Sequence, residues 1–250
     1  MTSRRLRRPA QSRAAGLDVQ TWLSAGWLDL LIVGGGVTPY SPTLKTFIDM
    51  AHRHGVPAYP CINHFREPLA MRSMAGVFHA LGGDGVYIFN YAGVPDSSEK
   101  HRCLSQLGTT PTLGGFDMRF PADTGFADWG YGHERLPSPF PVRLVAGAPI
   151  RVVAGPSATD PGATRRVTVT CTVVRPEAQL RVLVNGLPVP PAAVQRVDEK
   201  TFAAELAPEQ VRVGINQVVV LPGPGAAARI AATITGVVLT VEHPTVPGAE

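Results

Sequence analysis

The chain has 250 residues, of which 44% are hydrophobic, and this share can form a buried core, which excludes an intrinsically disordered protein. The net charge is +4, but the first 13 residues contain five arginines, Arg4, Arg5, Arg7, Arg8 and Arg13, and no acidic residue. Removing these five charges from +4 leaves −1, which excludes the broad basic surface of a specific nucleic-acid-binding protein.

The first residues have the composition of a leader. Residues 1–16 are basic and we expect them to be disordered. They lack the apolar run of a secretory signal, and no later segment has about 18 consecutive apolar residues for a membrane span. We therefore expect no membrane partner, and a cytoplasmic location for the chain as given.

Three apolar segments with strand character recur at a constant spacing. They are WLDLLIVGG (27–35), GVPAYPCIN (55–63) and GDGVYIFNY (83–91), and their first residues are 28 positions apart. This period is typical of βα units. The intervening segments predict helices over 42–54 and 68–81, and Asp18 is the expected cap of an earlier helix. Strands and helices in this order predict an α/β layer with parallel strands.

The second half has a different pattern. Residues 92–140 are rich in Gly, Pro, Asp and Ser and predict a long packed connection. From about residue 141 the period becomes two, as in RRVTVTCTVV, and Asn185-Gly186 between the apolar runs of LRVLVNGLPV predicts a type I′ hairpin. We therefore predict an antiparallel β-sandwich over 141–250 and expect it to fold alone.

Several segments carry a resemblance to known proteins. GLDVQTWLSAGWLDLLIVGG, GVPAYPCIN, REPLAMRSMAGVFHALGGDGVYIFNY and LGTTPTLGGFDMRFPAD resemble the C-terminal part of bacterial family-10-like glycoside hydrolase proteins, a TIM-barrel group. LRVLVNG and VRVGINQVVV are similar to the galactose-binding-type sandwich found in glycosidases. The resemblance implies that the three predicted units are the last three of a barrel.

The predicted fold class is therefore a partial (β/α) barrel over residues 17–140, followed by the β-sandwich over 141–250. The chain departs from the family at its beginning, where the arginine-rich leader stands in place of the earlier strands. This departure indicates a truncated barrel.

Polar residues follow the middle predicted strand, at the end where barrels hold their sites. Glu67 is the only carboxylate directly after this strand, and the resemblance implies a sugar-facing acid near this loop, so Glu67 is the candidate catalytic residue. A structural role is open too, because Glu67 precedes Pro68 at a helix start, where the helix dipole favours a carboxylate. Asn63, His64 and Arg66 are candidates for binding sugar hydroxyls.

Two further candidates lie at the end of the third predicted strand. Alternation places Val86, Ile88 and Asn90 on one face of this strand, so that Asn90 lies at the rim of a site. Tyr91 could stack on a sugar ring or pack against a helix.

The leading hypothesis for function is a glycoside-hydrolase-like protein that acts on or binds carbohydrate. Glycosidases generally need two carboxylates, and only Glu67 is a candidate, so the alternative is a non-catalytic carbohydrate-binding or structural fragment. A nucleotide-binding enzyme is disfavoured because the GxGxxG and GxxxxGK[ST] motifs are missing. We expect no cofactor, no metal, three buried thiols, and self-association through an open sheet edge.

Overall fold

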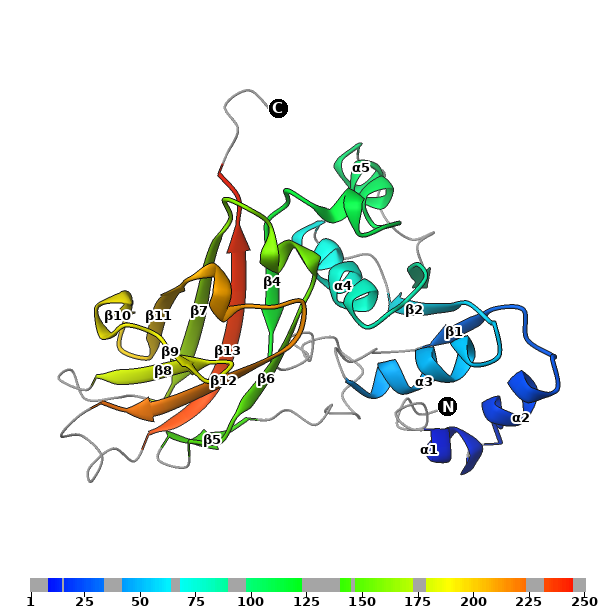
Figure 1. Cartoon of the computed structure of the whole chain (residues 1–250), viewed down its shortest axis with the longest axis horizontal. Coiled ribbons are helices and arrows are strands. Elements are labelled where there is room, and N and C mark those ends of the chain that lie inside the picture. Colours follow the sequence, from blue (N-terminus) through cyan, green and yellow to red (C-terminus); the bar gives the residue numbers. More distant parts are fainter. Residues whose placement is uncertain are drawn as a thin grey trace. The chain divides into compact units, whose positions relative to one another are not determined.

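The computed structural model describes residues 9–14, 16–33, 42–63, 68–89, 98–122, 140–144, 147–172, 179–223 and 232–244. The chain divides into two compact units (Figure 1). The first contains Met1–Gly114 and Phe126–Leu136, and the second contains Gly115–Gly125 and Pro137–Glu250. In the described ranges, no helix is long and apolar enough to cross a membrane.

The first unit is a three-stranded parallel sheet with helices. Its strands are β1 (Leu31–Val33), β2 (Ala58–Asn63) and β3 (Tyr87–Phe89), in the order β1-β2-β3. Its helices are α1 (Pro9–Ala14), α2 (Val19–Ser24), α3 (Pro42–His52), α4 (Pro68–Ala80) and α5 (Ser98–Gln106), and a 3-10 turn, η3, spans Pro111–Leu113. The predicted cap is confirmed, because the Asp18 carboxylate accepts a hydrogen bond from Thr21 N at 3.2 Å.

The two faces of this sheet differ in exposure. α3 and α4 contact the sheet, and Leu31, Val33 and Ile62 are buried. The register places Ile32, Tyr87 and Phe89 together on the other face, where they are 41%, 38% and 44% exposed. This face therefore exposes three large apolar side chains, and the predicted self-association through a sheet edge stays a prediction.

One carboxylate joins the first unit's sheet to α3. Asp84 Oδ2 accepts a hydrogen bond from Ala58 N at 2.7 Å and lies 2.8 Å from His52 Nε2. Burial raises the pKa of Asp84, but the hydrogen bonds from Ala58 and His52 outweigh it, so the pKa lies below its usual value. The position of Asp84 at the start of a strand indicates a structural role, and these contacts agree with it.

The predicted fold class, a partial (β/α) barrel followed by a β-sandwich, is wrong. The described residues are mainly β and form three separate sheets, and the parallel sheet has only strands of three, six and three residues. α3 and α4 lie between these strands in the chain, but a single sheet of three short strands is not the predicted partial barrel. Sequence period predicts the spacing of elements, whereas strand number, tilt and closure depend on tertiary pairing, which the period does not contain.

The second unit consists of two antiparallel sheets. Its strands are β4 (Met118–Pro121), β5 (Val142–Arg143), β6 (Ile150–Ala154), β7 (Thr164–Cys171), β8 (Leu180–Val184), β9 (Leu187–Pro188), β10 (Val194–Arg196), β11 (Thr201–Leu206), β12 (Gly214–Pro222) and β13 (Thr233–Glu242). The larger sheet has the order β10-β11-β7-β13-β4, with β5 also paired to β13, and the smaller has the order β6-β12-β8-β9. The 3-10 turns η5 (Pro156–Thr159), η6 (Pro191–Ala193) and η7 (Pro208–Gln210) connect strands of this unit.

Alternation along these strands forms the core between the two sheets. In β7, Val167, Val169 and Cys171 are buried, and the residues between them are half-buried. β13 and β4 of the larger sheet contact β6 of the smaller one, so the buried faces point toward each other. Figure 1 shows β7, β13 and β4 running side by side in the larger sheet.

β4 lies where the sequence pattern predicts no strand. It lies in the segment 92–140, predicted as a long connection, which also contains α5 and η3, so that prediction is wrong there. Met118 and Phe120 of β4 are 1% and 0% exposed, and they pair with Val241 and Leu239 of β13. β4 precedes residue 141 in the chain and yet belongs to the second unit.

We expect a polypeptide of residues 115–250 to unfold in one cooperative transition, and residues 141–250 alone to be less stable by about 3 kcal/mol or more. Removing β4 deletes the fully buried Phe120, and truncating a buried Phe costs about 3–5 kcal/mol. It also leaves the edge of β13 that pairs with β4 without a partner strand. Urea denaturation followed by circular dichroism measures the difference, and equal midpoints for the two polypeptides would contradict it.

Candidate functional site

Most of the predicted site residues fall outside the described residues. Glu67, His64, Arg66, Asn90 and Tyr91 all do. The remaining candidate, Asn63, is the last residue of β2, and its backbone is in register with Phe89 of β3. β2 therefore ends where the sequence predicts, and the strand-end site itself stays a prediction.

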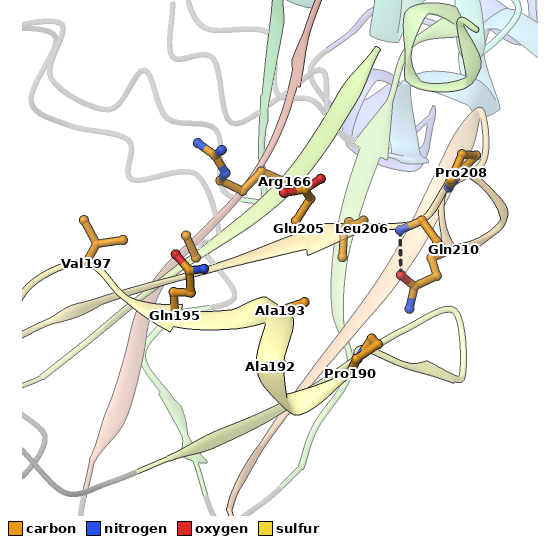
Figure 2. Close-up of a pocket in the computed structure, with 12 residues that line it drawn as sticks. Arg166, Pro190, Ala192, Ala193, Gln195, Val197, Glu205, Leu206, Pro208 and Gln210 are labelled. Atoms are coloured by element: carbon orange, nitrogen blue, oxygen red, sulfur yellow. Dashed lines mark hydrogen bonds between the residues drawn. The ribbon is translucent and has the colours of Figure 1, made fainter. Parts of the chain in front are cut away.

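The second unit contains a groove of about 810 Å³ on its larger sheet (Figure 2). This volume is within the range of roughly 300–1,000 Å³ typical of ligand sites. The groove is lined by Arg166 of β7, by Ala203, Glu205 and Leu206 of β11, by Gln195 of β10 and Val197 after it, and by Pro190, Ala192, Ala193, Ala207, Pro208 and Gln210 from the η6 and η7 segments. No aromatic side chain is among these lining residues.

Strand alternation brings a cation and an anion to the groove. Glu205 of β11 is directly opposite Arg166 of β7, and both point away from the core. Cross-strand neighbours of this kind have Cβ atoms about 4.5–5.5 Å apart. Within the described residues, neither side chain forms a hydrogen bond or an ion pair, so a guanidinium donor and a carboxylate acceptor both face solvent.

The opposite wall of the groove is small and apolar. Figure 2 shows the charged ends of Arg166 and Glu205 on one side of the space, with Ala192 and Ala193 of η6 on the other. Gln195 follows on β10, opposite Ala203, and adds an amide that has no hydrogen-bond partner among the described residues. The groove therefore combines three uncommitted polar side chains with a surface of methyl and methylene groups.

The β10–β11 hairpin that forms one end of the groove is held by its own loop. Asp198 Oδ1 accepts hydrogen bonds from Lys200 N at 2.7 Å and Thr201 N at 2.9 Å. The hydrogen bonds from Lys200 and Thr201 lower the pKa of Asp198 below its usual value. The guanidinium of Arg196 lies 5.2 Å from the ring centre of Phe202 and donates from Nε to Asp198 O at 3.0 Å.

The other end of the groove is fixed by Gln210, which is only 4% exposed. Its Oε1 accepts a hydrogen bond from Ala207 N at 2.9 Å, the dashed line in Figure 2, and its Nε2 donates to Pro188 O at 3.1 Å. Gln210 O in turn accepts from Asn185 Nδ2 at 2.9 Å. The η7 segment is therefore tied to the β8–β9 hairpin.

Asn185 and Asn216 complete this amide network. Asn185 Nδ2 also donates to Asn216 Oδ1 at 2.8 Å, and Asn185 Oδ1 accepts from Gln217 N at 2.9 Å. Asn216, 1% exposed, donates to Arg212 O and Gly214 O and accepts from Arg212 N. Both amides have their donors and acceptors satisfied, which is the condition for burying them without a large energetic cost.

The predicted type I′ hairpin is confirmed at the centre of this network. Asn185 and Gly186 have φ of +53° and +84°, and they join the antiparallel strands β8 and β9, with Val184 opposite Leu187. A type I′ turn requires positive φ at both central residues, and Asn and Gly adopt positive φ more readily than other residues.

The groove residues were not among the candidates from sequence. Alternation in RRVTVTC and TFAAEL does predict that Arg166 and Glu205 point to the polar face of their strands. Arg166 and Glu205 become neighbours only when β7 pairs with β11, and the sequence pattern does not predict which strands pair.

The chemistry available in the groove is hydrogen bonding. Glu205 is the only carboxylate among the lining residues, so the two-carboxylate arrangement of a glycosidase is not found in this groove. Over the described ranges, no group of three or more His, Cys, Asp or Glu side chains could hold a metal ion. Comparison with protein-family models and with curated proteins finds no match for this chain.

The three cysteines are free and buried, as predicted. Burial raises the pKa of Cys61 and of Cys171 to about 11. These thiols are therefore unlike activated nucleophiles, whose pKa is lowered.

We expect the native chain to react slowly with Ellman's reagent at pH 8, because only about one thiol in a thousand of Cys61 and Cys171 would be ionised with a pKa near 11. Cys103 is 1% exposed and is protected by burial. In guanidinium chloride all three should react at once. Fast labelling of Cys61 in the native chain, located by mass spectrometry, would contradict the assignment.

We expect Asn216→Ala to lower the free energy of unfolding by about 2 kcal/mol or more, because it removes the hydrogen bonds of a buried amide and leaves partly buried partners such as Arg212 N without theirs. Gln217→Ala is the matched control, since Gln217 is the next residue on β12 and its side chain is exposed. Thermal unfolding of both variants checks this, and similar stability of the two would show that the network contributes little.

Proposed function

We propose that this chain binds carbohydrate through the groove of its second unit and does not hydrolyse it. The observation that carries the proposal is the pair Arg166 and Glu205, opposite each other on adjacent strands, outward-pointing and uncommitted. A sugar hydroxyl both donates and accepts, so a guanidinium and a carboxylate side by side can bind two neighbouring hydroxyls of one ring.

The framework of the groove supports binding. Ligand sites need polar groups in fixed positions, and both ends of this groove are held by hydrogen-bonded segments, the Asp198 turn and the Gln210 network. A peptide ligand that adds to a sheet edge is less suited to the groove, because the edge strand β10 has only three residues.

The lining argues for binding rather than hydrolysis. Glycoside cleavage requires an acid together with a nucleophile or base, and Glu205 is the groove's single carboxylate. Loss of general acid–base assistance alone costs about 10² to 10⁴ fold in rate. The resemblance to glycoside hydrolase proteins is consistent with a sugar ligand and stays a prediction.

We expect Glu205→Gln and Arg166→Gln each to weaken binding of a saccharide by about tenfold or more, because a hydrogen bond to a charged group contributes about 1.5–3 kcal/mol. The matched controls are Glu209→Gln and Arg151→Gln, which remove the same charges at exposed positions that do not line the groove. Calorimetric titration with a panel of neutral, acidic, N-acetylated and 6-deoxy oligosaccharides measures the effect. Absence of any binding, or binding that both groove variants leave unchanged, would overturn the proposal.

A screen on aryl glycosides and polysaccharides tests the second half of the proposal. We expect no turnover above background by the purified chain. Turnover that Glu205→Gln abolishes would move catalysis into the groove, and turnover that Glu67→Gln abolishes would restore the hydrolase hypothesis with Glu67 as its carboxylate.

A further inference from the structure

The apolar wall of the groove gives information about the shape of the sugar. Sugar sites commonly use an aromatic ring to cover the flat CH face of a pyranose, and no aromatic residue lines this groove. Its apolar side chains are mostly small, with four alanines, Ala192, Ala193, Ala203 and Ala207, and two prolines, Pro190 and Pro208. Small apolar side chains suit a compact apolar substituent better than a flat ring face.

The backbone of this wall offers few hydrogen bonds to a ligand. Proline has no N–H group, which removes two donors at Pro190 and Pro208. The carbonyl of Pro190 accepts from Ala193 N at 2.9 Å, and the carbonyl of Ala207 accepts from Gln210 N at 3.0 Å. A ligand hydroxyl turned toward these residues would exchange its hydrogen bonds to water for contacts with methyl and methylene groups.

The charged side of the groove also limits the ligand. Arg166 and Glu205 together have no net charge, and Glu205 would repel a carboxylate or sulfate that approached Arg166. A neutral sugar with ring hydroxyls and one apolar group can form hydrogen bonds with Arg166 and Glu205 and place its apolar group against the alanines and prolines.

We propose that the groove prefers a 6-deoxyhexose, whose ring hydroxyls bind Arg166 and Glu205 and whose C6 methyl group contacts the wall of Ala192, Ala193 and the two prolines. This inference rests on the proposed carbohydrate-binding function and names the sugar class. Burial of one methyl group favours such a sugar over its C6-hydroxylated equivalent by about 4- to 10-fold.

Two matched pairs of sugars test this class. L-Fucose differs from L-galactose, and L-rhamnose from L-mannose, only in the hydroxyl at C6. We expect the methyl glycoside of at least one 6-deoxy sugar to bind the full chain about 4- to 10-fold more tightly than its partner, measured by calorimetry or by ligand-observed NMR. Equal affinity within both pairs, alongside binding that depends on Glu205, would overturn the 6-deoxyhexose assignment and leave the proposed function intact.

A substitution in the apolar wall tests where the C6 methyl group of the sugar binds. Ala192→Ser adds one hydroxyl at an exposed position, and we expect it to reduce the preference within the pair to about twofold or less. Ala25→Ser, in the first unit, is the control and should keep the preference. A preference that survives Ala192→Ser would place the methyl group elsewhere and overturn the assigned contact, whereas no binding of any sugar would refute the proposed function itself.

Discussion

The second unit depends on the pairing of its last strand, β13, in the middle of the larger sheet. β13 is in register with β7 on one side and with β4 and β5 on the other. Its partner strands β4, β5 and β7 all come earlier in the chain. The larger sheet therefore cannot form completely until the C-terminal strand is available. The groove follows from this, because β7 is held by β13 on one edge and carries β11 on the other.

Polar contacts reinforce the end of β13 where it meets β4. His243 N donates to Asp117 Oδ1 at 2.7 Å, and His243 Nε2 lies 3.2 Å from Asp160 Oδ2. The same oxygen of Asp160 accepts from Gly115 N at 3.1 Å. These contacts join the residues before β4, the residue after β13 and the turn after η5. The segment that begins the larger sheet is therefore held to the segment that ends it.

The sequence predicts the local features and misses those that need distant pairing. The Asp18 cap, the Asn185-Gly186 turn and the alternation of β7 are set within a few residues, and the structure confirms each. The barrel prediction fails because a repeated spacing says nothing about how many strands join or whether they close. β4 was missed because its residues pair only with the far end of the chain. The groove was missed because Arg166 and Glu205 are separated in sequence and meet only through β7 and β11.

Adjacent arginines of β7 have different surroundings because strand alternation points them to opposite faces of the sheet. Arg165 points inward, is 3% exposed, and donates to Ala158 O, Asp160 O and Ala163 O at 2.6–2.7 Å. Its charge is buried, so these hydrogen bonds are required for the fold. Arg166 points outward beside Glu205, and its guanidinium has no such partners among the described residues. An exposed ion pair between Arg166 and Glu205 would contribute only about 0–1 kcal/mol, so leaving the two groups unpaired costs the fold little.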